Sequence, residues 1–111
     1  MNHPLKIYKK TEVTFDQVYP TLKNFPNAEK YTLCAEIKNA FLNLMKNILL
    51  GNKVASKRQH YQEEADGYLQ FCKILIDFSH RQEYINDNFH QDVKTKLTEI
   101  GRMLSGWIKS T

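Results

Sequence analysis

The chain has 111 residues, of which 41% are hydrophobic, and this size and content favour one compact domain with a modest core. Its 16 Lys and Arg residues exceed its 12 Asp and Glu residues, so the net charge of +4 favours an anionic partner. No stretch approaches the roughly 18 apolar residues of a membrane span, and residues 1–10 lack the apolar run of a secretory signal. We therefore expect a cytoplasmic protein with a single domain over residues 1–111, in which residues 1–12 form a flexible N-terminal arm.

Few turn-forming residues interrupt the chain, since it holds only three prolines and four glycines. A β protein would need a turn roughly every 8 to 12 residues, so helices are predicted for most of the chain. The first helix is predicted from about Thr14 to Phe25, because Thr14 and Gln17 have the spacing of a capping box. Pro20 should kink this helix or mark its true start. A turn is expected over residues 24–27, since the residue before a proline is pushed out of helical geometry.

Apolar residues that recur every three or four positions mark three further helices. The second is predicted from about Glu29 to Gly51, a residue suited to the left-handed turn that closes a helix. The third is predicted over about residues 54–79, and the fourth continues from Phe89 almost to the C-terminus. Short connections make consecutive helices antiparallel, so the predicted fold is all-α, an up-and-down antiparallel four-helix bundle.

The sequence lacks the residue patterns of catalysis and metal binding. Its four histidines have neither the i to i+4 pairing nor the nearby carboxylates and cysteines of a helical metal site. Cys34 and Cys72 lie far apart between apolar neighbours, as expected of buried reduced thiols. The scattered glycines form no phosphate loop, and no base stands beside a nucleophile in sequence. We therefore expect a non-enzymatic protein with no metal and no other cofactor.

Basic residues are concentrated between Glu36 and Glu63, a segment that contains no acidic residue. The segment covers the end of the second predicted helix and the start of the third, so much of it should gather at one end of the bundle. Two interpretations remain open. The cations either form a solvated helix end that the helix dipole stabilises, or form a patch that contacts phosphates without reading base sequence.

Two glycines, Gly101 and Gly106, lie inside the last helical pattern, where each costs about 1 kcal/mol relative to alanine. A helical glycine lets another backbone come close, and the single tryptophan, Trp107, follows with Ile108 beside it. Tight packing within the chain and a subunit interface would both explain this pattern. These four residues are therefore the candidate oligomer interface.

The C-terminal segment 99–109, with the sequence EIGRMLSGWIK, resembles the signature of the accessory variability determinant (Avd) of diversity-generating retroelements. The same broader family includes four-helix proteins encoded by intervening sequences in large-subunit ribosomal RNA genes. Further positions agree with the family, so the resemblance spans roughly residues 13–110. These positions are Tyr19-Pro20, Phe25-Pro26 and Ala65-Asp66.

The resemblance implies a four-helix protomer that assembles into a five-membered, barrel-like ring with a positively charged surface. It also implies a non-catalytic role in which the ring binds a reverse transcriptase and supports the copying of template RNA into mutated complementary DNA. The family often places two basic residues one turn apart on the third helix, and the matching positions here are Lys73 and Asp77. The residues expected to contact nucleic acid or polymerase are Lys38, Lys46, Lys53, Lys57, Arg58, Lys73, Arg81 and Arg102.

The main alternative is a ribosomal-RNA intervening-sequence protein, a structural oligomer without a polymerase partner. A neighbouring reverse-transcriptase gene with a template and variable repeat pair would distinguish the two. A third class, a bundle that binds or converts a small molecule, would need an internal cavity lined by convergent polar groups, which the apolar stripes do not predict.

Overall fold

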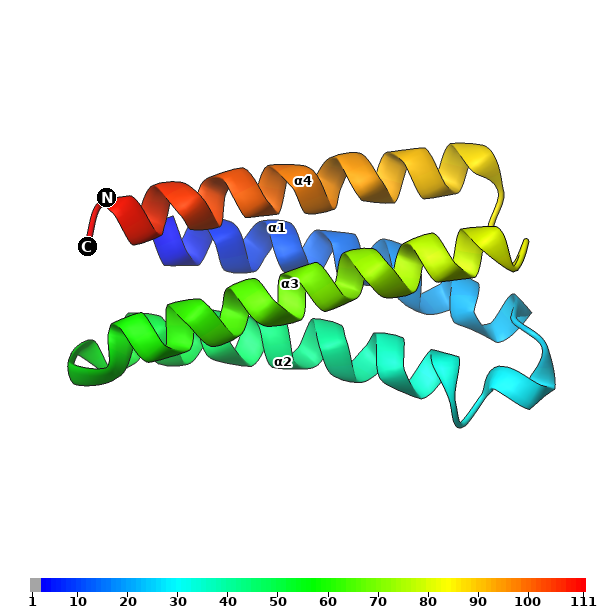
Figure 1. The fold of residues 1–111 in the computed structure, drawn as a ribbon, viewed down its shortest axis with the longest axis horizontal. Coiled ribbons are helices and arrows are strands. Elements are labelled where there is room, and N and C mark those ends of the chain that lie inside the picture. Colours follow the sequence, from blue (N-terminus) through cyan, green and yellow to red (C-terminus); the bar gives the residue numbers. More distant parts are fainter. Residues whose placement is uncertain (1–2) are drawn as a thin grey trace.

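The computed structural model describes residues 3–111, which form a bundle of four long α-helices with a longest dimension of 43 Å (Figure 1). Consecutive helices run antiparallel, and no strand occurs within the described residues. The predicted all-α, up-and-down bundle is therefore confirmed at the level of the protomer. The helices in chain order are α1 (His3–Val18), α2 (Leu33–Lys53), α3 (Arg58–Arg81) and α4 (Asp87–Lys109).

All four helices share one hydrophobic core. Helix α1 packs on α2 and α4, and α3 packs on the same two helices. The apolar stripe predicted for the fourth helix is buried from Val93 to Trp107, because residues three and four apart lie on one face of a helix. Among the helices of residues 3–111, none has an apolar stretch of the length that a membrane crossing requires.

Helix α1 begins well before the position predicted from the sequence. It starts at His3, so the prediction of a flexible arm over residues 1–12 is wrong for residues 3–12. Residues 1–2 lie outside the described part of the chain. The predicted capping box is also wrong, because Thr14 lies in the last half of the helix rather than at its start.

Two buried threonines explain why the apolar periodicity did not predict the first half of α1. Thr11 and Thr14 lie on the same buried face as Ile7 and are fully buried. The Thr11 hydroxyl donates to the Ile7 carbonyl oxygen, and the Thr14 hydroxyl donates to that of Lys10, each at 2.8 Å. These hydrogen bonds satisfy the hydroxyls within the core, so a face without a continuous apolar stripe can still be buried.

Pro20 changes the helix type rather than kinking α1. Helix α1 ends at Val18, and the 3₁₀ helix η1 (Tyr19–Asn24) follows with Pro20 in its first turn, where the missing N–H costs no hydrogen bond. The predicted turn is present, since Phe25 is extended at φ −69° and ψ 155°. A short 3₁₀ turn, η2 (Asn27–Glu29), then leads to α2.

Gly51 lies inside α2 and does not close it, so its predicted role as a helix end is wrong. No glycine among residues 3–111 has a positive φ. A Cβ atom added at Gly51 would lie 2.8 Å from Cη2 of Trp107, closer than two such atoms approach. The missing side chain therefore makes the space that the Trp107 ring fills.

The turn between α3 and α4 uses local capping. Glu83 adopts a left-handed conformation with φ 64°, and Asn86 follows as the cap of α4. The Asn86 side-chain oxygen accepts a hydrogen bond of 2.8 Å from the Phe89 backbone N–H, as preferred N-cap residues do.

Candidate nucleic-acid interface

The bundle has two ends with different connections (Figure 1). The hairpin end carries the α2–α3 connection, the start of α1 and the C-terminus. The double-loop end carries the α1–α2 and α3–α4 connections. The predicted cations divide between these ends and the sides of the bundle.

Three of the predicted cations gather at the hairpin end, as expected. Lys53 lies in the last turn of α2 and Lys57 in the short 3₁₀ turn before α3, and both are exposed. Arg58 is only half-exposed, because its Nε donates to the Gly51 carbonyl oxygen at 2.8 Å and its Nη2 to that of Asn52 at 3.2 Å. Arg58 thus closes α2 by satisfying free carbonyl groups at its end, whereas the two lysines remain open to a ligand.

Lys38 lies outside this group, although the larger part of the basic segment gathers at the hairpin end as predicted. Lys38 lies about four turns from Lys53 along α2, roughly 22 Å at 1.5 Å per residue, and so belongs to the double-loop end. Lys46 is exposed between them. The basic segment is continuous in sequence but extends along one helix in space.

Carboxylates pair with lysines elsewhere on the surface. Within residues 3–111, none of the eight predicted contact residues forms an ion pair. The cations of the predicted set therefore keep their charge available to an external anion. The lysine–carboxylate pairs that join helices or neighbouring turns of α4 are Lys10–Glu99 at 3.4 Å, Lys94–Asp77 at 3.0 Å and Lys96–Asp92 at 3.2 Å.

Asp77, where the chain departs from the family pattern, joins α3 to α4. Its Oδ1 lies 2.8 Å from His90 Nε2 and 3.0 Å from Lys94 Nζ. Partial burial raises the pKa of Asp77, but hydrogen bonds from His90 and Lys94 outweigh it, so the pKa lies below its ordinary value. Asp77 is therefore a helix-joining anion, and Lys73 alone represents the basic pair on this helix.

The remaining predicted cations lie apart from one another. Lys73 is half-buried, and its Nζ would lie 3.7 Å from a Cβ added at Gly101. Arg81, at the double-loop end, places its guanidinium 5.6 Å from the ring centroid of Phe78. Arg102 is exposed on α4. The eight cations thus form a dispersed positive surface rather than one compact patch.

Two of the four candidate interface residues are used within the protomer. Trp107 is only 3% exposed and packs against Gly51, and a Cβ at Gly101 would lie 3.3 Å from Leu69 Cδ2. Packing within the chain therefore explains these two positions. Gly106 has open space around it, and Ile108 is 39% exposed, so both remain available for an interface.

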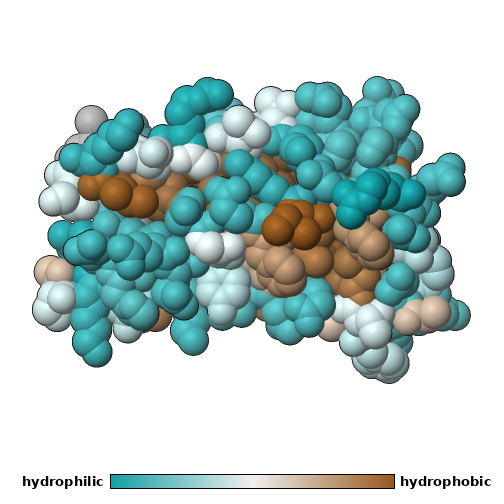
Figure 2. All heavy atoms as spheres, viewed as in Figure 1, coloured by the Kyte–Doolittle hydropathy of each residue, from teal (hydrophilic) through white to brown (hydrophobic). Residues whose placement is uncertain are grey.

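Helix α3 carries an apolar surface that the sequence analysis did not single out. Phe71 is 37% exposed and Ile74 58% exposed, and Phe78 follows one turn later, half-buried. Their spacing of three and four residues places them on one face of the helix. Figure 2 shows the corresponding brown surface over the middle of α3, bordered by hydrophilic atoms.

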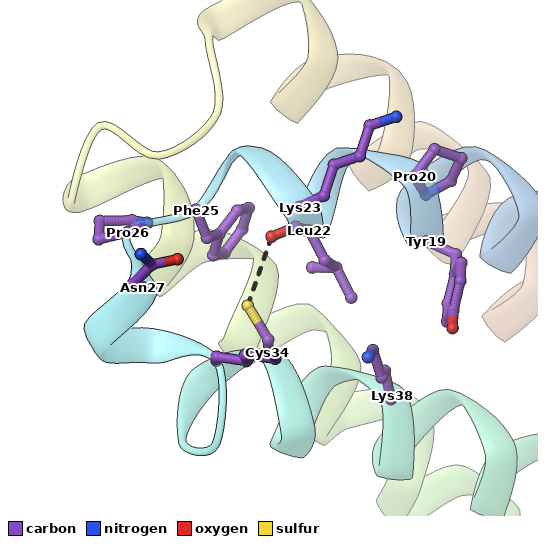
Figure 3. A pocket seen from close by; sticks show the side chains of 10 residues that line it. Tyr19, Pro20, Leu22, Lys23, Phe25, Pro26, Asn27, Cys34 and Lys38 are labelled. Carbon is purple, nitrogen blue, oxygen red and sulfur yellow. Dashed lines mark hydrogen bonds between the residues drawn. The ribbon is translucent and has the colours of Figure 1, made fainter.

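A cleft between η1 and α2 was also missed. It has a volume of about 510 Å³, and none of the described residues that line it is acidic. Aromatic-proline pairs alternate with lysines over residues 19–30, and this pattern could have indicated one wall of the cleft. The opposite wall comes from α2, and only the folded structure brings it near. The lining residues are Tyr19, Pro20, Leu22, Lys23, Phe25, Pro26, Asn27, Lys30, Cys34 and Lys38 (Figure 3).

Cys34 joins the two elements that form this cleft. Its Sγ donates to the Leu22 carbonyl oxygen at 3.7 Å, which links α2 to η1 (Figure 3). Burial raises the pKa of the Cys34 thiol, so it stays protonated and able to donate. Burial also raises the pKa of Cys72, to about 12. Both cysteines are buried free thiols, as the sequence predicted.

Comparison with known proteins agrees with the resemblance found in the sequence. The sequence model of the bAvd-like family matches residues 5–111, nearly the whole chain. A search of curated proteins found no match. Because the matched region includes all four helices and the C-terminal segment, the chain belongs to the bAvd-like family.

Proposed function

We propose that this chain is a non-enzymatic accessory subunit of a diversity-generating retroelement. In this role it binds the reverse transcriptase and the template RNA, or the complementary DNA, and so supports mutagenic reverse transcription. Membership of the bAvd-like family supports an accessory role. The observation that carries the proposal is the positive surface, whose eight predicted cations have no carboxylate partner within the described residues.

Such a surface suits contacts to a phosphate backbone. Lysine and arginine contacts to phosphate release counterions, so they contribute affinity that falls steeply as salt rises. They carry no base readout, which fits a subunit that holds a nucleic acid while a polymerase copies it. Exposed cations at both ends of the bundle would let one strand contact several places on the protomer.

The proposal includes assembly of several copies into a ring, as the resemblance implies. The apolar face of Phe71, Ile74 and Phe78 supports assembly, because a large side chain such as Ile74 is 58% exposed in the protomer. Apolar side chains that lie together on an exposed helix face suit a contact with another protein surface. Gly106 and Ile108, at the hairpin end, remain separate proposed interface positions.

Co-purification of the retroelement's reverse transcriptase with this protein tests the proposal. At about 50 mM salt, where phosphate contacts are strong, the wild-type protein should retain polymerase and template RNA. The double variant Lys53→Glu/Lys57→Glu should bind RNA at least about tenfold more weakly while keeping its helical circular dichroism. Arg58 stays unchanged in this variant, because it closes α2.

The matched control is Lys9→Glu/Lys10→Glu, which changes the net charge by the same amount at lysines that already face Glu12 and Glu99. Its RNA affinity should stay within about threefold of wild type. If the reverse transcriptase fails to associate at low salt while the oligomer persists, the structural intervening-sequence role replaces the proposed one.

A further inference from the structure

The exposed ring of Tyr19 lies at the mouth of the η1–α2 cleft. Two neighbouring side chains contact the Tyr19 ring and hold it in position. The ring of Phe15 meets it edge-on, with centroids 5.6 Å apart, and Lys38 Nζ lies over the ring, 5.2 Å from its centroid. Tyr19 nevertheless remains 53% exposed. An aromatic ring that is fixed in position and open to solvent is a stacking platform for another planar group.

The charged residues that line the cleft are all positive. Lys23, Lys30 and Lys38 line the cleft, and none of the described lining residues is acidic. The carboxylate of Glu29, close by in sequence, is occupied by hydrogen bonds from Thr32 Oγ1 at 2.6 Å and Tyr84 Oη at 2.9 Å. The charge of Glu29 still acts on Cys34, but three lysines line the cleft against this one carboxylate, so the cleft favours an anion.

The size and lining of the cleft suit a ligand with an apolar planar part. Its volume of about 510 Å³ falls within the range of small-ligand sites, roughly 300 to 1,000 Å³. Leu22, Phe25 and Cys34 provide apolar lining between η1 and α2 (Figure 3). Lys23, Lys30 and Lys38 also line the cleft. A planar aromatic group with an attached phosphate combines both requirements.

We infer that this cleft binds one unpaired nucleotide of a single-stranded nucleic acid, with the base stacked on Tyr19 and its phosphate contacted by the lysines. The inference deepens the proposed function and rests on its nucleic-acid contact. A duplex keeps its bases stacked inside the helix, whereas unpaired bases can turn outward onto aromatic side chains. We therefore expect the double-loop end to bind single strands more tightly than duplexes. Dispersed phosphate contacts alone would not produce this preference.

Fluorescence anisotropy with a labelled single-stranded RNA, and with a hairpin duplex of equal charge, tests the cleft at about 50 mM salt. Tyr19→Ala should weaken binding of the single strand about tenfold, since base stacking on one ring contributes that much. Tyr19→Phe should keep wild-type affinity, because the ring remains. Binding of the duplex should change less than twofold in both variants.

Tyr31→Ala is the matched control. Tyr31 is 83% exposed and has Lys30 Nζ 5.5 Å from its ring centroid, yet it does not line the cleft. This variant should bind the single strand as wild type does. An equal loss in Tyr31→Ala and Tyr19→Ala would overturn the cleft as a specific site.

Cross-linking gives a second measurement, which uses the wild-type protein and so does not require that a variant folds. RNA containing 4-thiouridine, irradiated with the wild-type protein, should cross-link to peptides within residues 15–38. Cross-links confined to residues 46–58, or unchanged single-strand affinity in a folded Tyr19→Ala protein, would overturn the cleft and leave the proposed function standing. No detectable RNA binding by the wild-type protein would instead refute the nucleic-acid contact of the proposed function itself.

Discussion

At the scale of single residues, the glycines show how one residue type serves different purposes in one bundle. Gly51 sits under the ring of Trp107, and Gly101 lies against Leu69. Gly67 and Gly106 have open space where a side chain would be. Their helical positions look alike in sequence, so only the neighbours from other helices distinguish a packing glycine from a replaceable one.

Gly51→Ala should destabilise the protein by about 1 to 3 kcal/mol, because the new methyl group would overlap the rigid Trp107 ring. Gly67→Ala is the control, and it should stabilise the protein by up to about 1 kcal/mol, since alanine favours an open helical position. Urea denaturation of both variants measures these changes. Equal stability of Gly51→Ala and wild type would contradict the described contact with Trp107.

At the scale of elements, two kinds of contact join the helices. Apolar stripes supply the core, and a few polar groups fix neighbouring helices in register. At the α3–α4 junction the rings of His80 and His90 stack with centroids 3.9 Å apart, and His80 Nε2 lies 2.7 Å from Asp87 Oδ1. Asp77 binds His90 and Lys94 in the same region. This polar junction joins α3 to α4 at the double-loop end.

The junction predicts a pH dependence of the free energy of unfolding. The pKa of Asp77 is lowered in the folded protein, so its contribution is fully present above its unfolded pKa of about 3.9 and is lost as the pH falls through the folded value. Asp77→Asn should therefore reduce stability at pH 7 by about 1 kcal/mol or less, as expected for a partly exposed pair.

Urea denaturation of wild type and Asp77→Asn between pH 7 and pH 2 measures this difference. The two stabilities should converge as the pH falls from about 4 through the lower pKa of folded Asp77, below which both side chains are uncharged. A difference that stays constant down to pH 2 would show that Asp77 acts through packing and not through its charge.

At the scale of the whole molecule, the exposed lysines of α2 and of the hairpin end lie away from the apolar face of α3, whose edge is bordered by Arg81 over the Phe78 ring. Lys46, Lys53 and Lys57 are exposed on α2 and in the turn that follows it. The apolar face of Phe71, Ile74 and Phe78 lies on α3 (Figure 2). Such a separation would allow copies to associate through one surface and leave the other for a nucleic acid.

Ile74→Lys should lower the mass of the oligomer measured by light scattering, because it places a charge in the proposed apolar contact. Val13→Lys on α1 is the control of similar exposure, 49% against 58%, and should leave the mass unchanged. An unchanged mass in Ile74→Lys would show that this face of α3 is not in the interface, and Ile108 would remain the candidate contact.

The sequence by itself determined the helical class, the second, third and fourth helices, the turn at Phe25 and the family. Apolar periodicity reports the buried face of a helix directly, because residues three and four apart share that face. A proline likewise restricts its neighbour wherever it occurs. These properties belong to short stretches of chain, so they can be read without knowledge of distant segments.

Only the tertiary structure decided how distant segments meet. Helix α1 can pack into the core from its start because the Thr11 and Thr14 hydroxyls bond to the preceding turn and can then be buried against other helices. Trp107 is buried in the core because Gly51 of α2 has no side chain and leaves space for its ring. The cleft at Tyr19 exists because α2 brings Lys38 beside η1. Each outcome depends on space and charge supplied by another helix, which the periodicity of one segment does not encode.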